Sequence, residues 1–199
     1  MRKSTVITGQ VFGTVDWVTD DKREIGMFIR TSGRQTRCIL QGPVVEQFIA
    51  NNQVAKGNLV TSFGDLNARV MKRASSKLEP ELLLNAFKLD IEPPRTIRPR
   101  GALYAQLKSV VMYWEEKTLH MKSFLNSRDA GHADCVTCSV FMKSWVDGIE
   151  EEGRTSFVSN IAVGKEYTAM CNVETDVYVS NGKEVPVLRL LPTDFKLQG

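Results

Sequence analysis

Residues 36–66 read TRCILQGPVVEQFIANNQVAKGNLVTSFGDL, and this stretch gives the clearest indication of the fold. Its first part belongs to a run of strand-forming residues, Arg34–Leu40. Pro43 then opens a helix, because the apolar residues at 44, 45, 48 and 49 fall on one helical face. Lys56-Gly57 is a turn that leads into a further strand, Lys56–Asp65. The stretch therefore predicts strand, helix, strand.

The flanking sequence adds three more strands to this unit. Thr5–Val18 is rich in β-branched residues and is interrupted by Gly9 and Gly13, which predicts a long strand that bends. Glu24–Arg30 alternates apolar and polar side chains, and Glu81–Asp90 supplies the last strand. Five strands with a helix between the third and fourth are typical of the OB-fold, a small Greek-key barrel. A single β-sandwich that uses all ten strands of the chain is the alternative.

The second half of the sequence repeats the order of the first. Gln10-Val11 matches Gln106-Leu107, Cys38 matches Cys138, and Gly57 matches Gly164. The proline-rich segment Glu92–Gly101 separates the halves, because prolines remove backbone donors and favour extended structure. We therefore expect an all-β protein of two tandem OB-folds with short helices: residues 1–92, a linker at 93–101, and residues 102–199.

Composition limits the functional classes. The 199 residues include 26 Lys and Arg, 23 Asp and Glu, and four Cys, and 42% are hydrophobic. This composition argues against disorder and against a disulfide framework, and no apolar run is long enough to cross a membrane. The N-terminus lacks the apolar stretch of a secretory signal. We expect an intracellular, cytoplasmic protein without a membrane partner, whose first half and linker are basic and whose second half is acidic.

Several glycine, lysine and apolar positions in residues 36–66 resemble those of a known family. Gly42, Lys56-Gly57, Val60, Gly64 and Leu66 stand where bacterial and phage-type single-stranded DNA-binding proteins place their Gly, Lys-Gly and Gly-x-Leu positions. Residues 7–13 are similar to the opening strand of that family. The resemblance implies binding of single-stranded DNA, with RNA as an alternative, no cofactor, and self-association or contacts with replication and recombination proteins.

The sequence also departs from the family. Positions at which members stack bases on aromatic rings hold Gln35, Gln41 and Met71 in the first half, and Phe141 and Tyr178 in the second. Most members end in an acidic tail with an apolar tip, whereas residues 192–199 contain one acid. The resemblance is therefore to a divergent relative from a phage, plasmid or other mobile element.

Binding of a single strand requires cations for the phosphates and flat side chains for the bases. In the first half we expect both around the second hairpin and in a basic loop, Arg69–Lys77, between the fourth and fifth strands. The candidate residues of the first half and the linker are Trp17, Phe28, Arg30, Arg34, Arg37, Arg69, Lys72, Arg73, Lys77, Arg95, Arg98 and Arg100.

The second half offers a candidate stacking platform. Residues 119–125 alternate, which turns His120, Lys122 and Phe124 outward, and Tyr113 or Trp114 would join them. The candidate residues are Trp114, Lys122, Phe124, Phe141 and Tyr178. Packing of these rings in a core or a dimer interface is the alternative, and Glu150–Glu152 is expected to be a solvated helix end.

Neither metal binding nor catalysis is predicted. Cys135 and Cys138 have a zinc-like spacing, but the residues between them favour a strand, in which positions three apart point to opposite faces. No phosphate-binding glycine loop, His-Glu-x-x-His or nucleophile elbow occurs. The prediction is sequence-independent binding and protection of single-stranded DNA by a non-enzymatic protein. The rival hypothesis is an OB-fold adaptor that connects proteins in a nucleoprotein complex.

Overall fold

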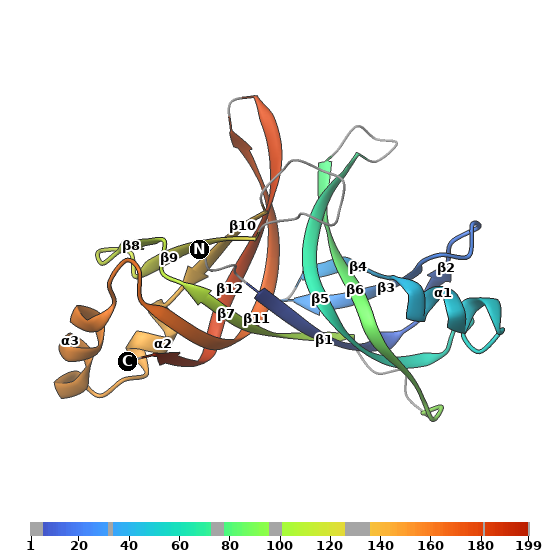
Figure 1. Cartoon of the computed structure of the whole chain (residues 1–199), viewed down its shortest axis with the longest axis horizontal. Helices are drawn as coiled ribbons and strands as arrows, with labels where there is room; N and C mark the ends of the chain where they lie inside the picture. Colours follow the sequence, from blue (N-terminus) through green and yellow to red (C-terminus); the bar gives the residue numbers. More distant parts are fainter. Residues whose placement is uncertain are drawn as a thin grey trace. The chain divides into compact units, whose positions relative to one another are not determined.

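The computed structural model describes residues 6–31, 34–72, 78–95, 101–125, 136–180 and 182–198 (Figure 1). The chain forms two compact units. The N-terminal unit comprises residues 8–105, and the C-terminal unit comprises residues 106–199 together with residues 1–7. The domain boundaries expected at 92/93 and 101/102 stay a prediction, and residues 96–100 of the linker lie outside the described residues.

The N-terminal unit is a barrel of short and long strands with one helix. Its elements are β1 (Val6–Thr14), β2 (Trp17–Val18), β3 (Ile25–Thr31), β4 (Arg34–Gln41), α1 (Pro43–Ala50), β5 (Leu59–Lys72) and β6 (Leu78–Glu92). The strands are ordered β2-β3-β4-β6-β5-β1, with β4 and β6 parallel and the β1–β5, β2–β3, β3–β4 and β5–β6 pairs antiparallel.

The chain closes this barrel where β1 passes into β2. The Val15 N–H donates to the Asn58 carbonyl at 2.8 Å, next to β5, and the following Asp16 N–H donates to the Gly26 carbonyl of β3 at 2.9 Å. The long bending strand predicted for residues 5–18 is thus two strands, β1 and β2, which stand at opposite ends of the strand order. This strand order, with the helix between the third and fourth OB strands, confirms the predicted OB-fold.

The C-terminal unit is built on the same plan. Its elements are β7 (Ala102–Val110), β8 (Tyr113–Glu115), β9 (His120–Leu125), β10 (Val136–Phe141), α2 (Lys143–Asp147), α3 (Glu151–Asn160), β11 (Glu166–Ser180) and β12 (Lys183–Leu197). The order β7-β11-β12-β10-β9-β8 and the parallel β10–β12 pair match the first barrel. The Met112 N–H donates to the Lys122 carbonyl at 3.2 Å and thereby joins the end of β7 to β9. Residues 150–152 are exposed at the start of α3, as expected.

The segment 69–72 corrects the sequence analysis, which placed it in a loop. Arg69–Lys72 is strand, because β5 and β6 remain paired as far as Lys72 and Leu78. Arg69 lies directly opposite Glu81, and this pair of opposite charges stabilises the extended hairpin. Figure 1 shows β5 and β6 as a long curved hairpin, and β11 and β12 as its counterpart in the other unit. Residues 73–77 lie outside the described residues.

Each barrel has its own apolar core. Met27, Cys38 and Leu82 are fully buried in the first, and Met121, Cys138 and Leu188 are fully buried in the second. Met27, Cys38 and Leu82 are register partners on β3, β4 and β6, and Cys138 and Leu188 are partners on β10 and β12. The next side chain along each strand points to the opposite face. Cys38, Cys138 and Cys171 are buried inside the barrels and are not joined in disulfides. Within the part of the chain that the structure describes, no helix is long and apolar enough to cross a membrane.

Candidate nucleic-acid interface

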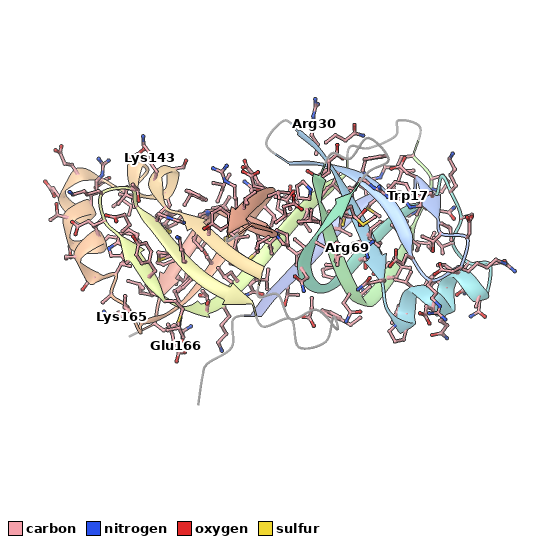
Figure 2. The ribbon with its side chains drawn as sticks, turned by 90° about the horizontal axis from the view of Figure 1, so that it is seen from above. Trp17, Arg30, Arg69, Lys143, Lys165 and Glu166 are labelled. Carbon is pink, nitrogen blue, oxygen red and sulfur yellow. The ribbon has the colours of Figure 1, made fainter. Side chains whose placement is uncertain are left out.

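Five strands of the N-terminal unit contribute to one outer face. Trp17 of β2, Phe28 of β3, Arg37 of β4, Arg69 of β5 and Glu81 of β6 form a connected cluster, which we call the N-terminal face. Trp17 and Arg69 are labelled in Figure 2. Four of these five residues, all except Glu81, were candidates from sequence. The structure brings them together although they lie up to 52 positions apart along the chain.

Glu81 forms ion pairs with both arginines of this face. Its carboxylate is 3.1 Å from Nε of Arg37 and 2.7 Å from Nε of Arg69, and its side chain is 1% exposed. The two arginine side chains are 30% and 33% exposed. A buried carboxylate needs such partners, because burial without them carries a large desolvation cost. Sequence analysis missed Glu81. The only available signal was an acid in a strand opposite a basic residue.

The Trp17 side chain packs against residues of β3 and β4. The indole packs over Gly26, where a Cβ would overlap the ring. The Phe28 ring meets it edge-on with centroids 5.4 Å apart, and the Arg37 guanidinium lies over it at 4.8 Å. Glycine at position 26 is therefore required by the close approach of the indole to the β3 backbone.

The remaining candidate residues of the first half and the linker are not part of this cluster or are not described by the structure. Arg30 is exposed on β3, beyond Phe28 on the same side of the strand, and is labelled in Figure 2. Arg95 lies over the ring of Phe12 of β1 at 5.2 Å. The side chains of Arg34 and Lys72 are not described, although both residues lie in strands. Arg73, Lys77, Arg98 and Arg100 lie outside the described residues.

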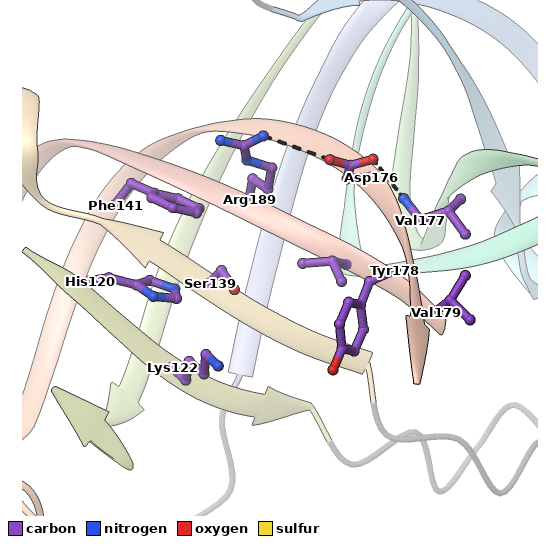
Figure 3. Close-up of a pocket in the computed structure, with 10 residues that line it drawn as sticks. His120, Lys122, Ser139, Phe141, Asp176, Val177, Tyr178, Val179 and Arg189 are labelled. Atoms are coloured by element: carbon purple, nitrogen blue, oxygen red, sulfur yellow. Dashed lines mark hydrogen bonds and ion pairs between the residues drawn. The ribbon is translucent and has the colours of Figure 1, made fainter. Parts of the chain in front are cut away.

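The C-terminal unit carries a hollow of ≈ 770 Å³, which we call the C-terminal groove (Figure 3). It lies over β9, β10, β11 and β12. Its lining residues are His120, Lys122, Ser139, Phe141, Asp176, Val177, Tyr178, Val179, Val187 and Arg189. Of the predicted residues, Lys122, Phe141 and Tyr178 meet here, with Tyr178 56% exposed. The side chain of Phe124 is not described.

Phe141 is the centre of a three-layer stack in the groove. The His120 ring lies nearly parallel to it, with an interplanar angle of 10° and centroids 4.7 Å apart. The Arg189 guanidinium lies over the same ring at 4.7 Å, and Figure 3 shows Phe141 between the two. His120 and Arg189 were not among the predicted site residues. The outward alternation of β9 already indicated His120, whereas no sequence signal marked Arg189.

Acidic groups accompany Arg189. Its Nη1 lies 3.7 Å from the Asp176 carboxylate, and its Nε lies 3.9 Å from the Glu174 carboxylate. Burial lowers the pKa of His120, and the nearby charges of Lys122 and Arg189 lower it further. His120 is therefore neutral at pH 7, which favours its stacking against an apolar ring.

The register of β8 corrects one candidate in the second half. Tyr113 pairs with Lys122, as Trp17 pairs with Gly26 in the first barrel. Lys122 lies over the Tyr113 ring at 5.3 Å, and Tyr113 meets His120 edge-on at 6.5 Å. Trp114 instead pairs with the buried Met121. The aromatic residue next to the groove is thus Tyr113 rather than Trp114, because alternate strand residues point to opposite faces.

The described residues offer no group of metal ligands. Among them, no three His, Cys, Asp or Glu side chains come together in a way that could hold an ion. Cys138 is buried inside the second barrel, and Cys135 lies outside the described residues. The expectation that Cys135 and Cys138 hold no zinc ion therefore stays a prediction.

Comparison with known proteins identifies the fold. No family model and no curated protein matches the sequence. The structure is similar to the crystal structure of the wild-type single-stranded DNA-binding protein from Thermus aquaticus, with a TM-score of 0.54 and 12% identity over 99% of this chain and 95% of that one. A deletion mutant of the same protein gives a TM-score of 0.53 at 13% identity, over 98% and 95% of the two chains. The chain has the fold of a single-stranded DNA-binding protein.

Several of the residues that suggested the fold of a single-stranded DNA-binding protein are glycines with backbone angles that other residues rarely adopt. Gly42 (φ 107°) precedes α1, and Gly57 (φ 94°) forms the turn into β5. Gly164 (φ 93°) takes the place of Gly57 before β11. Only glycine adopts such angles without strain, so these positions tolerate little change even when the rest of the sequence diverges. The family resemblance read from residues 36–66 is confirmed for the fold.

Proposed function

We propose that the protein binds single-stranded DNA largely independently of sequence and has no enzymatic activity. The observation that carries this proposal is the N-terminal face, where two rings and two guanidiniums lie together on the outer surface of an OB barrel. Flat groups, rings or guanidinium planes, can stack on bases while exposed cations such as Arg30 contact phosphates, and neither contact reads the base sequence. The C-terminal groove offers a second such surface.

The wider role is part of the proposal. Protection or presentation of single strands during replication, recombination or DNA transfer would use this binding, and a phage or mobile element is the proposed origin. The proposed partners are single-stranded DNA, further copies of this chain, and replication or recombination proteins in the cytoplasm. Light scattering of the protein with and without oligo-dT tests self-association.

Fluorescence anisotropy tests the central claim. Labelled oligo-dT, duplex DNA and RNA of equal length are titrated with the protein at two salt concentrations. We expect tighter binding to oligo-dT than to the duplex, and weaker binding at high salt, because bound cations release counterions from the phosphates. Equal or tighter binding to RNA would replace DNA with RNA in the proposal. No binding of any strand by the folded protein would favour the adaptor hypothesis.

A pair of variants places the contact on the N-terminal unit. Arg30→Ala removes an exposed cation beside Phe28, whereas Lys143→Ala removes an exposed cation from α2 of the other unit (Figure 2). We expect Arg30→Ala to reduce the slope of log K against log salt by about 0.7, the value for one phosphate contact on a single strand. Lys143→Ala should leave the slope unchanged. Equal slopes for both variants would remove Arg30 from the interface.

A further inference from the structure

The two barrels share an arrangement that the roles predicted from sequence do not explain. In each, a guanidinium lies over an aromatic ring on the outer surface: Arg37 over Trp17 at 4.8 Å, and Arg189 over Phe141 at 4.7 Å. From the sequence, Arg37 was expected to contact phosphates, and Arg189 was not among the candidate residues. The contacts of both side chains indicate a different role.

The charges of both arginines are already offset within the protein. Arg37 lies 3.1 Å from the buried Glu81 carboxylate, and Arg189 lies 3.7 Å and 3.9 Å from Asp176 and Glu174. A guanidinium with a carboxylate partner gains less from a phosphate than a cation surrounded by water, because the partner's negative charge repels the phosphate. These two residues are therefore poorly suited to be the main phosphate contacts.

The rings beneath the guanidiniums are poorly accessible to a base. Phe141 has His120 on one face and Arg189 on the other (Figure 3). Trp17 is surrounded by Gly26, Phe28 and Arg37. The side chains of Arg37 and Arg189 remain partly accessible, at 30% and 39% exposed, although the Nε atom of each is buried. A flat surface for a base is thus offered by each guanidinium, with an aromatic ring behind it.

We propose that nucleobases stack on the guanidinium planes of Arg37 and Arg189, and that the neighbouring carboxylates hold these planes in position. The guanidinium group is planar and stacks on π-systems, and single-stranded bases are known to stack on such planes. Glu81 in the first barrel, and Glu174 and Asp176 in the second, act as positioning residues. This inference rests on the proposed binding of single-stranded DNA, and it assigns which groups contact the bases.

Lysine substitution separates stacking from charge. Arg37→Lys and Arg189→Lys keep the positive charge but remove the plane. We expect each variant to bind oligo-dT at least about fivefold more weakly, within the range measured for loss of one stacked base. The slope of log K against log salt should stay as in the wild type, because the number of cations is unchanged. Arg154→Lys on α3, outside both proposed binding surfaces, is the matched control and should retain wild-type affinity.

An abasic strand provides the second measurement. Oligo-dT and an abasic oligonucleotide of equal length carry the same phosphates, so the ratio of their affinities reports contacts to bases. We expect this ratio to be large for the wild type and to fall at least about fivefold in the Arg37→Lys, Arg189→Lys double variant. Far-UV circular dichroism and urea unfolding of each variant confirm that the barrels are folded.

The outcomes distinguish this inference from the function on which it rests. A wild type that binds neither strand overturns the proposed function itself. A wild type that binds oligo-dT, with lysine variants that keep both its affinity and its preference over the abasic strand, overturns the stacking role alone. Equal losses on both strands, with a smaller salt slope, would assign Arg37 and Arg189 to phosphates and would also overturn it.

Discussion

Glu81 is the residue on which the charges of the N-terminal face depend. It is 1% exposed and contacts Arg37 and Arg69, both of which are about one third exposed. We expect Glu81→Gln to lower the free energy of unfolding by about 2 kcal/mol, less than for a fully buried pair because water still reaches the arginines. Urea unfolding measures this change.

Asp65→Asn is the matched control for that substitution. Asp65 is an exposed acid on β5, so its replacement should change the stability by less than about 0.5 kcal/mol. If Glu81→Gln were as stable as Asp65→Asn, the ion pairs of Glu81 would contribute nothing net to folding. Its role would then be limited to the orientation of the two guanidiniums.

The buried thiols give a prediction about pH. Burial raises the pKa of Cys38 to about 12, with a smaller contribution from the negative charge of Glu81, and burial alone raises the pKa of Cys171 to about 12. An unfolded chain ionises these thiols near the ordinary value of 9.0, so it releases protons that the folded chain retains. The contribution of these two thiols to stability should therefore be unchanged well below pH 9 and should decrease as the pH rises toward 12.

Thiol-specific reagents test the same feature at constant pH. At pH 8, Cys38, Cys138 and Cys171 should react with Ellman's reagent only after denaturation, because all three are buried and because burial also raises the pKa of Cys38 and Cys171. Mass spectrometry of the modified chain identifies the residues. Rapid labelling of Cys38 in the native protein would show that the first barrel opens readily.

Among the elements, the long hairpins are shaped by irregularities at matching places. The register of β5 against β6 shifts between Phe63 and Gly64, and that of β11 against β12 shifts between Met170 and Cys171. A Cβ at position 64 would approach the backbone carbon of Asn85 to 2.7 Å. Such bulges increase twist, which helps a pair of long strands to curve around a barrel.

Gly64→Ala should therefore destabilise the first barrel. We expect a loss of about 1–3 kcal/mol in the free energy of unfolding, because backbone atoms rather than a flexible side chain must move. Gly153→Ala in α3 is the control, since its Cβ would make only ordinary contact with Ile149 at 3.4 Å. That change should be neutral or stabilising by up to about 1 kcal/mol. A Gly64→Ala protein as stable as Gly153→Ala would contradict the close approach.

Sequence patterns predicted the elements better than their ends. Alternation identified β3, a run of strand-forming residues identified β4, and the proline at position 43 marked the start of α1. The end of β5 was wrong, because the cluster Arg69–Lys77 looked like a solvated loop and the partner of Arg69 lies in another strand. Tyr113 could not be separated from Trp114, because β8 has only three residues and its direction follows from its pairing with β9.

The candidate site was harder to predict than the fold. Anchors such as Gly42 and Gly57 mark local backbone angles, which one stretch of sequence encodes. The role of a side chain such as Arg189 depends instead on Phe141, which lies on a strand far from it in sequence. Cross-strand contacts of this kind require the register of the whole barrel, which periodicity alone does not provide.

For the whole molecule, bound DNA should raise thermal stability. A ligand that binds only the folded state stabilises it by about 2.7 kcal/mol at a concentration of 100 Kd. We expect oligo-dT to raise Tm in a calorimetric scan more than the same mass of duplex DNA does. If the two units unfold in separate transitions, a shift of both would indicate that both bind. A shift of neither would contradict binding to the native state.

The parallel pairing of β4 with β6 has a consequence for how the chain is made. Strand β6 is the last of its unit to be synthesised, yet it lies between β4 and β5. Until residue 92 has left the ribosome, the nascent first barrel lacks strand β6. The edges of β4 and β5 that β6 will cover can then pair with other strands. At about 5–20 residues per second, the 20 residues from the end of β5 to the end of β6 take about one to four seconds to make. Codon usage over this segment would therefore influence the yield of folded protein.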